Sequence, residues 1–177
     1  TGVKVGNAVI SLHLPGEGEK LTTLLEHYKA EGKKTGLVTT SFIEDATPAC
    51  FAAHQPNRRM LREIGMDILN THPDLLMGAY RAITPEAAGS FGYQVVETSE
   101  QLAAFNTDQE ASLAGLFALG KMPYEFDERT PEKPDLSEMT QKALEALDSA
   151  PNGFFLMVEN ENIDESGHEN HIQRHVT

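Results

Sequence analysis

The order of helical and apolar segments is the feature that most restricts the fold of this sequence. Short apolar stretches such as Leu75–Met77, Leu113–Leu119 and Phe154–Val158 alternate with segments whose apolar residues recur at helical spacing. Strands that are apolar throughout are typical of a parallel sheet covered by helices on both faces. We therefore predict an α/β fold, a three-layer sandwich in which helices flank a largely parallel sheet.

Capping residues, glycines, prolines and the spacing of apolar residues locate the individual helices and strands. We expect strands over 35–40, 75–77, 92–96, 113–119 and 154–158, and helices over 20–31, 57–69 and 136–147, with another starting near 99. Asn57 and Asp135 are the expected N-caps of two helices, and Gly32 ends the first one. The proline-rich, acidic segment 120–135 is expected to be a surface excursion. We treat 1–177 as a single, partial domain.

Charge narrows the possible partners. The chain has 177 residues, 40% of them hydrophobic, and a net charge of −13 from 27 acidic and 14 basic residues. This surplus of negative charge argues against nucleic acid and anionic membranes as partners. No apolar run approaches the roughly 20 residues of a membrane span. Thr1–Lys4 does not resemble a signal peptide, and both ends of the sequence read as cuts within a longer chain.

Polar residues that follow buried strands are the first candidates for a site, because ligands of open α/β sheets bind outside the carboxyl ends of the strands. Asp45 and Thr47 follow the first predicted strand and precede Pro48. They can simply cap a helix, which spacing alone favours. Their oxygens are also suited to a hard cation such as magnesium.

A second group of candidates follows the last predicted strand. Glu159 ends that apolar strand, where an unpaired carboxylate is costly. Asp164 and His168 are four residues apart, which places carboxylate and imidazole on one helical face, a spacing able to hold zinc. The ordinary alternative is a capping aspartate beside a solvent-facing histidine.

Two adjacent arginines supply candidate phosphate ligands. Arg58 and Arg59 lie at the expected start of the helix over 57–69, and their usual fate is a solvated surface pair. A guanidinium directed into the site would instead bind phosphate through two hydrogen bonds.

Several ordered motifs, spread over nearly the whole chain, resemble alkaline phosphatase. They are Thr35–Thr40, Asp45–Ala49, Ala53–His54 through Asn57–Arg58, Gly92–Val96, Lys121–Tyr124, Ser137–Thr140, and Gly153–Glu159 with Ile163–Asp164 and His168. The opening Thr1–Lys4 looks like the stretch that follows the nucleophilic serine of that family. Several motifs in compatible order are far more specific than any one of them.

The resemblance implies a role for each candidate. Thr47 and Glu159 would supply oxygens to magnesium, and Asp164 and His168 would bind one zinc. Arg58 would bind the phosphate, while Asp45 would stand behind the magnesium ligands and orient water on that ion. The implied activity is hydrolysis of phosphate monoesters to inorganic phosphate by in-line displacement, with two zinc ions about 4 Å apart. The implied parent protein is a homodimer in the periplasm or outside the cell.

The resemblance also implies what this sequence lacks. The nucleophilic serine would lie just before Thr1 and the remaining zinc ligands well after Thr177, so we expect little or no phosphatase activity from the 177 residues alone. Residues 160–162 replace the small residues usual after the metal-binding glutamate, which we expect to narrow the pocket. Glu165 stands where a basic or imidazole side chain is common, so local charge and metal preference should change.

Two other interpretations stay open at the level of sequence. One is a non-catalytic relative that binds a divalent cation or a protein partner through the same scaffold. The other is a different member of the metal-dependent phosphohydrolase and phosphomutase superfamily. These interpretations depend on Thr47, Glu159, Asp164 and His168 converging from two strand ends on one cavity beside a guanidinium. They would fail if the Thr47 loop and the strand end at Glu159 lay far apart or on opposite faces of the sheet.

Overall fold

Five strands and eight helices alternate along the described chain. A computed structural model describes residues 1–107 and 110–176, so Thr177 lies outside it. The strands are β1 Lys34–Phe42, β2 Leu75–Tyr80, β3 Gln94–Val96, β4 Leu113–Leu119 and β5 Phe154–Glu159. The helices are α1 Leu24–Ala30, α2 Ala46–Ala52, α3 Leu61–Thr71, α4 Pro85–Ser90, α5 Ser99–Ala104, α6 Leu136–Leu147, α7 Asn162–His168 and α8 Ile172–Val176.

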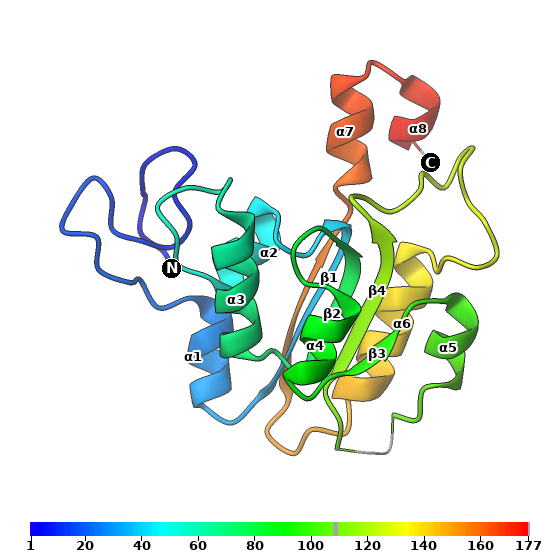
Figure 1. The fold of residues 1–177 in the computed structure, drawn as a ribbon, viewed down its shortest axis with the longest axis horizontal. Helices are drawn as coiled ribbons and strands as arrows, with labels where there is room; N and C mark the ends of the chain where they lie inside the picture. Colours follow the sequence, from blue (N-terminus) through cyan, green and yellow to red (C-terminus); the bar gives the residue numbers. More distant parts are fainter. Residues whose placement is uncertain (108–109, 177) are drawn as a thin grey trace.

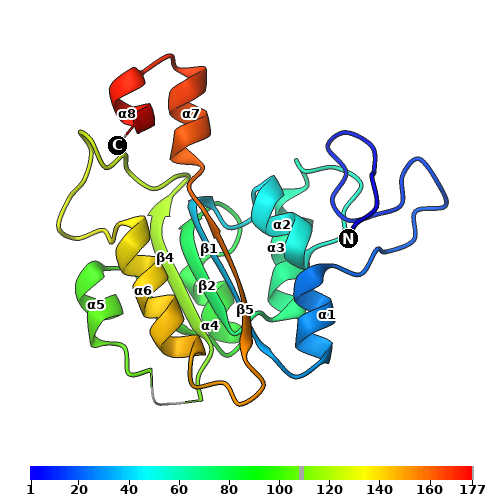
Figure 2. The ribbon, with the colours of Figure 1, turned by 180° about the vertical axis from the view of Figure 1, so that it is seen from behind.

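The strands form one sheet in the order β3-β4-β2-β1-β5, and every pair in it is parallel. Alternate residues of β1 show how the two faces are covered. Leu37 packs in one cluster with α1, α2, α3 and α4, whereas Val38 packs in a second cluster with α5 and α6. Figures 1 and 2 show the resulting three layers. The predicted fold class is confirmed.

The outermost strand β5 departs from full burial. Most of its residues are only partly buried, and Val158 is exposed, because β5 has a neighbour on one side only. Its apolar sequence therefore does not mean burial on both faces. Beyond its carboxyl end, α7 and α8 stand clear of the sheet (Figure 1).

Most helix ends follow the expected capping chemistry. Asp135 forms a capping box with Glu138 at the start of α6, as predicted. The prediction that Asn57 caps the next helix after α2 is wrong. The Asn57 side chain accepts the N–H of Arg59 in a turn, and α3 begins only at Leu61, without a side-chain cap. The N–H of Arg58 bonds to the carbonyl of Ala8, so Arg58 lies in a loop and not at a helix start.

The segment 120–135 contains no helix before α6 and no strand, and it is only partly the surface excursion that we predicted, because it is anchored to the body of the protein. Met122 and Tyr124 are buried, and the guanidinium of Arg174 in α8 lies 4.3 Å from the centre of the Tyr124 ring. Arg174 also donates to Asp127 at 2.9 Å and Glu128 at 3.0 Å. The anchoring ties this excursion to α8, and α8 in turn packs against α7.

Candidate metal and phosphate site

Asp45 takes the capping role that spacing alone favours, and it also binds an arginine. It is the N-cap of α2, where its Oδ1 accepts the N–H of Ala46 at 2.7 Å. The same oxygen accepts Nη2 of Arg58 at 2.5 Å, and Oδ2 accepts the hydroxyl of Ser41 at 2.9 Å. The carboxylate thus holds one guanidinium of the predicted arginine pair at the end of β1.

Pairing between β1 and β5 brings the two predicted groups to one edge of the sheet. Thr39 lies opposite Glu159 in the register, and its hydroxyl donates to the Glu159 carboxylate at 2.7 Å. Asp45 lies in the short turn between β1 and α2, and a second short turn connects β5 to α7. The two strand ends therefore lie side by side. Of the four side chains expected to converge on one cavity, Asp164 and His168 line it, and Thr47 and Glu159 do not.

The spacing between Asp164 and His168 has the expected geometry. Both residues lie in α7, and Nε2 of His168 is 3.4 Å from the Asp164 carboxylate. Their side chains are 69% and 78% exposed, so both are open to a ligand from outside. This arrangement is equally that of a surface ion pair, and the residues around it decide what it can bind.

One cavity of about 470 Å³ connects these groups, and its lining comes from β1, the loops after β1, α2 and β2, and the segments around α3 and α7. The lining residues are Phe42, Asp45, Arg58, Arg59, Leu61, Arg81, Glu161, Asp164, Glu165 and His168. Thr47 is exposed in the first turn of α2 and Glu159 ends β5, and neither belongs to this lining. Four of the six predicted site residues share the cavity, and the other two flank it.

Carboxylates at this edge of the sheet repel one another. Glu161, which sequence reasoning did not select, has its pKa raised to about 7 by burial and by the charges of Glu165, Asp45, Glu159 and Asp164. Such a group gains from any cation placed among these residues. Its only signal in the sequence is a position two residues after the strand end.

The neighbouring residues at 160–162 do not all narrow the pocket as expected. Asn162 is buried, and its amide donates to the carbonyl of Pro123 at 3.1 Å, whereas Asn160 is exposed and its side chain accepts the hydroxyl of Thr40 at 3.3 Å. Only Glu161 of the three lines the cavity.

Glu44 is a second residue that the sequence analysis passed over. It is fully buried beside Asp45, and its carboxylate accepts the N–H groups of Arg81 at 3.2 Å, of Ala82 at 2.7 Å and of Ile83. Burial raises its pKa, and the hydrogen bonds from Ile83 and Ala82 oppose that rise. Glu44 thereby fixes the loop that brings Arg81 to the cavity.

The side chains at this site are of the types that bind divalent cations, but too few of the described ones lie close together to hold an ion. Carboxylate, hydroxyl and imidazole groups from two strand ends suit magnesium and zinc. Among residues 1–107 and 110–176, however, no three His, Cys, Asp or Glu side chains are gathered closely enough to hold an ion. Asp164 and His168 would provide two of the three protein ligands that catalytic zinc usually has.

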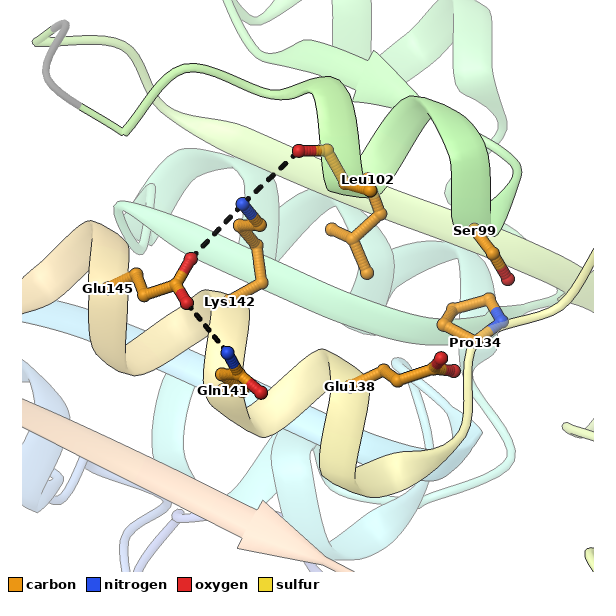
Figure 3. A pocket seen from close by; sticks show the side chains of 8 residues that line it. Ser99, Leu102, Pro134, Glu138, Gln141, Lys142 and Glu145 are labelled. Carbon is orange, nitrogen blue, oxygen red and sulfur yellow. Dashed lines mark hydrogen bonds and ion pairs between the residues drawn. The ribbon is translucent and has the colours of Figure 1, made fainter.

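A separate hollow of about 220 Å³ lies between α5 and α6 (Figure 3). The groups of α6 in it pair with one another: the Lys142 ammonium is 3.1 Å from Glu145, and Gln141 donates to Glu145 at 2.9 Å. The Ser99 hydroxyl, by contrast, is buried without a hydrogen-bond partner among the described residues. None of the predicted site residues lines it. The predicted site residues that line a cavity belong to the one at the strand ends.

Comparison with known proteins agrees with this geometry. The family model described as alkaline phosphatase matches residues 1–75 and 78–177. The chain belongs to the alkaline phosphatase family. It is 38% identical to alkaline phosphatase 4 of Bacillus subtilis (strain 168), over 96% of this chain and 38% of that protein. Members of this family act on phosphate monoesters.

Solved alkaline phosphatases share the fold as well. The crystal structure of the Thermus thermophilus enzyme matches with a TM-score of 0.88 and 34% identity, over 99% of this chain and 39% of that one. A mutant of TAB5 alkaline phosphatase with Mg bound in the M3 site matches with a TM-score of 0.79 and 25% identity, over 99% and 51%. This chain thus spans about half or less of the relatives it matches.

Proposed function

We propose that this chain is part of a phosphomonoester hydrolase of the alkaline phosphatase type that uses zinc and magnesium. The observation that carries the proposal is one cavity that joins the Arg58–Asp45 pair to Asp164 and His168 at the carboxyl ends of β1 and β5. Because the chain belongs to the alkaline phosphatase family, we infer that phosphate monoesters bind in this cavity, where positive charge would stabilise the phosphate group during hydrolysis.

The residues take the roles implied by the resemblance. Arg58 binds the phosphate group of the ester, and Asp45 holds its guanidinium in place and orients water near magnesium. Asp164 and His168 would hold zinc, and Thr47 and Glu159 would hold magnesium. When bound, the ions supply positive charge that stabilises the attacking and leaving oxygens of the displacement.

The magnesium assignment has indirect support from a neighbour and from the local charge. The TAB5 structure with Mg bound shows that a protein of the same fold takes this ion. In the present chain, the raised pKa of Glu161 results from burial and from four facing carboxylates, which a divalent cation would neutralise. The zinc assignment rests on the pairing of Asp164 with His168.

The proposal extends to the setting of the whole protein. We infer that it is an exported homodimer that releases inorganic phosphate and has neither nucleic acid nor a membrane as a partner. The net charge of −13 supports the last two points. Of the helices that the structure describes, none is long and apolar enough to cross a membrane.

The test compares the complete gene product with the present chain. We expect the complete protein to hydrolyse p-nitrophenyl phosphate, EDTA to abolish the turnover, and the 177-residue chain to show little or none. Turnover by the 177 residues would contradict their proposed inactivity. A complete protein without turnover would favour the non-catalytic relative.

Metal content provides a separate readout of the ligands. In the complete protein, Asp164→Asn should lower the zinc content measured by mass spectrometry, whereas Glu63→Gln on α3, which lies outside the cavity lining, should leave it unchanged. Equal zinc content in both variants would exclude Asp164 as a ligand.

A further inference from the structure

A third arginine of the cavity has no role in the function proposed above. Arg81 lies in the loop after β2, and its guanidinium carbon is 4.0 Å from the centre of the Phe42 ring. Phe42 and Arg81 both line the cavity that contains Arg58. Since β1 and β2 are adjacent and parallel, the two residues come from neighbouring strand ends.

The guanidinium of Arg81, unlike those of two other arginines of the protein, is not neutralised by a carboxylate among the described residues. Arg58 is paired with Asp45 at 2.5 Å, and Arg174 is paired with Asp127, Glu128 and Glu169. Within the described part of the chain, no carboxylate forms an ion pair with the guanidinium of Arg81. The contact with the Phe42 ring uses none of the N–H donors of the guanidinium, so they can still bind an anion.

The backbone at Arg81 is held in place by Glu44. The buried carboxylate of Glu44 accepts the N–H of Arg81 at 3.2 Å, and it binds the next two N–H groups of the same loop. The ring contact and the hydrogen-bonded loop already restrict the Arg81 side chain. It therefore loses less conformational entropy on binding a ligand than a free surface arginine does.

The cavity offers room for more than a phosphate group. Its volume of about 470 Å³ lies within the range of small-molecule sites. An ester whose phosphate binds Arg58 therefore extends within the same cavity that Arg81 lines.

We propose that Arg81 is a specificity-determining residue, which binds a second anionic group of the substrate and favours phosphate monoesters that carry a carboxylate or another phosphate. This inference rests on the function proposed above, and it adds the class of substrate. The binding would be electrostatic and hydrogen-bonded, so it should weaken as salt rises.

The experiment uses the complete protein with zinc and magnesium and a matched pair of esters. Glycerol 3-phosphate and 3-phosphoglycerate share a three-carbon skeleton and differ in a carboxylate. We expect wild-type kcat/KM to favour 3-phosphoglycerate, and Arg81→Ala to lower the ratio of the two kcat/KM values about tenfold. Arg81→Lys, which keeps the charge but not the planar fork, should lie between them.

Arg62→Ala is the matched control. Arg62 is an exposed arginine of α3 outside the cavity lining, so its removal changes net charge equally and should leave the ratio unchanged. A ratio that does not change in Arg81→Ala, or changes equally in Arg62→Ala, would overturn the inference and leave the proposed function standing. If the wild type turns over neither ester nor p-nitrophenyl phosphate, both fail.

Discussion

The cavity at the strand ends and the hollow between α5 and α6 differ in where their polar groups find partners. In the hollow, Lys142 and Gln141 bind Glu145 within a single helix (Figure 3). In the cavity, the groups come from loops far apart in the sequence, and several carboxylates face one another. Groups that are satisfied locally have little left for a ligand, whereas unmatched charge that the fold holds in place is typical of a functional site.

The largest effect should come from the paired arginine. In the complete protein, Arg58→Ala should lower kcat/KM for p-nitrophenyl phosphate about 100-fold, because a preorganised donor to the phosphate is lost. Steady-state kinetics would measure it. Lys142→Ala, which removes a positive charge from the hollow, should change kcat/KM less than about twofold. Similar losses in the two variants would remove the functional distinction between the regions.

The buried carboxylate below the cavity should give the next largest effect. Glu44→Ala leaves the N–H groups of Arg81, Ala82 and Ile83 without their acceptor, which should lower the free energy of unfolding by about 2 kcal/mol. Urea unfolding of the chain would measure the change. Glu44→Gln keeps one acceptor oxygen and should cost about half as much. Equal costs would mean that charge, and not hydrogen bonding, holds the loop.

A smaller effect should follow from the repulsion among carboxylates. Burial and facing charges raise the pKa of Glu161 from 4.5 to about 7, so the folded state holds this proton more tightly than the unfolded state does. In EDTA, stability should therefore fall as pH rises from about 4.5 to about 7. Glu161→Gln should lack this fall and be more stable than wild type at pH 8 by about 1 kcal/mol, after allowance for solvent screening.

The hollow supplies the control for this pH effect. Hydrogen bonds from Gln141 and Lys142 lower the pKa of Glu145, which is the opposite direction. Glu145→Gln should accordingly gain no stability at pH 8, as measured by urea unfolding at several pH values. A gain in both variants would point to net charge as the cause and not to the local cluster.

The fold and the contacts that obey local rules could be predicted from the sequence. Alternation of apolar strands with helices gave the parallel sheet, and the spacing of Asp164 and His168 gave their contact. The motif around Asp45 pointed to the end of β1, where Asp45 binds Arg58. Which ions Thr47 and Glu159 hold stays a prediction.

What the sequence did not yield depends on contacts between distant segments. Glu44 binds N–H groups 37 to 39 residues away, and Arg81 becomes a candidate ligand only once its contact with Phe42 is known. The helix start at Asn57 was mispredicted because the N–H of Arg58 bonds to Ala8, a partner that local capping rules do not include. Tertiary contacts of this kind override local propensity.

The smallest effect tests whether the hollow is indeed without function. The hydroxyl of Ser99 is buried there and has no hydrogen-bond partner among the residues that the structure describes. Ser99→Ala removes an unpaired polar atom and substitutes a better helix former, so the free energy of unfolding should rise by about 0.5 kcal/mol. Thermal unfolding would measure the change, with Ser137→Ala, which loses a hydrogen bond to Asp135, expected to go the other way. A loss of stability in Ser99→Ala would mean that the hydroxyl binds something in the hollow, and the contrast between the two regions would then fail.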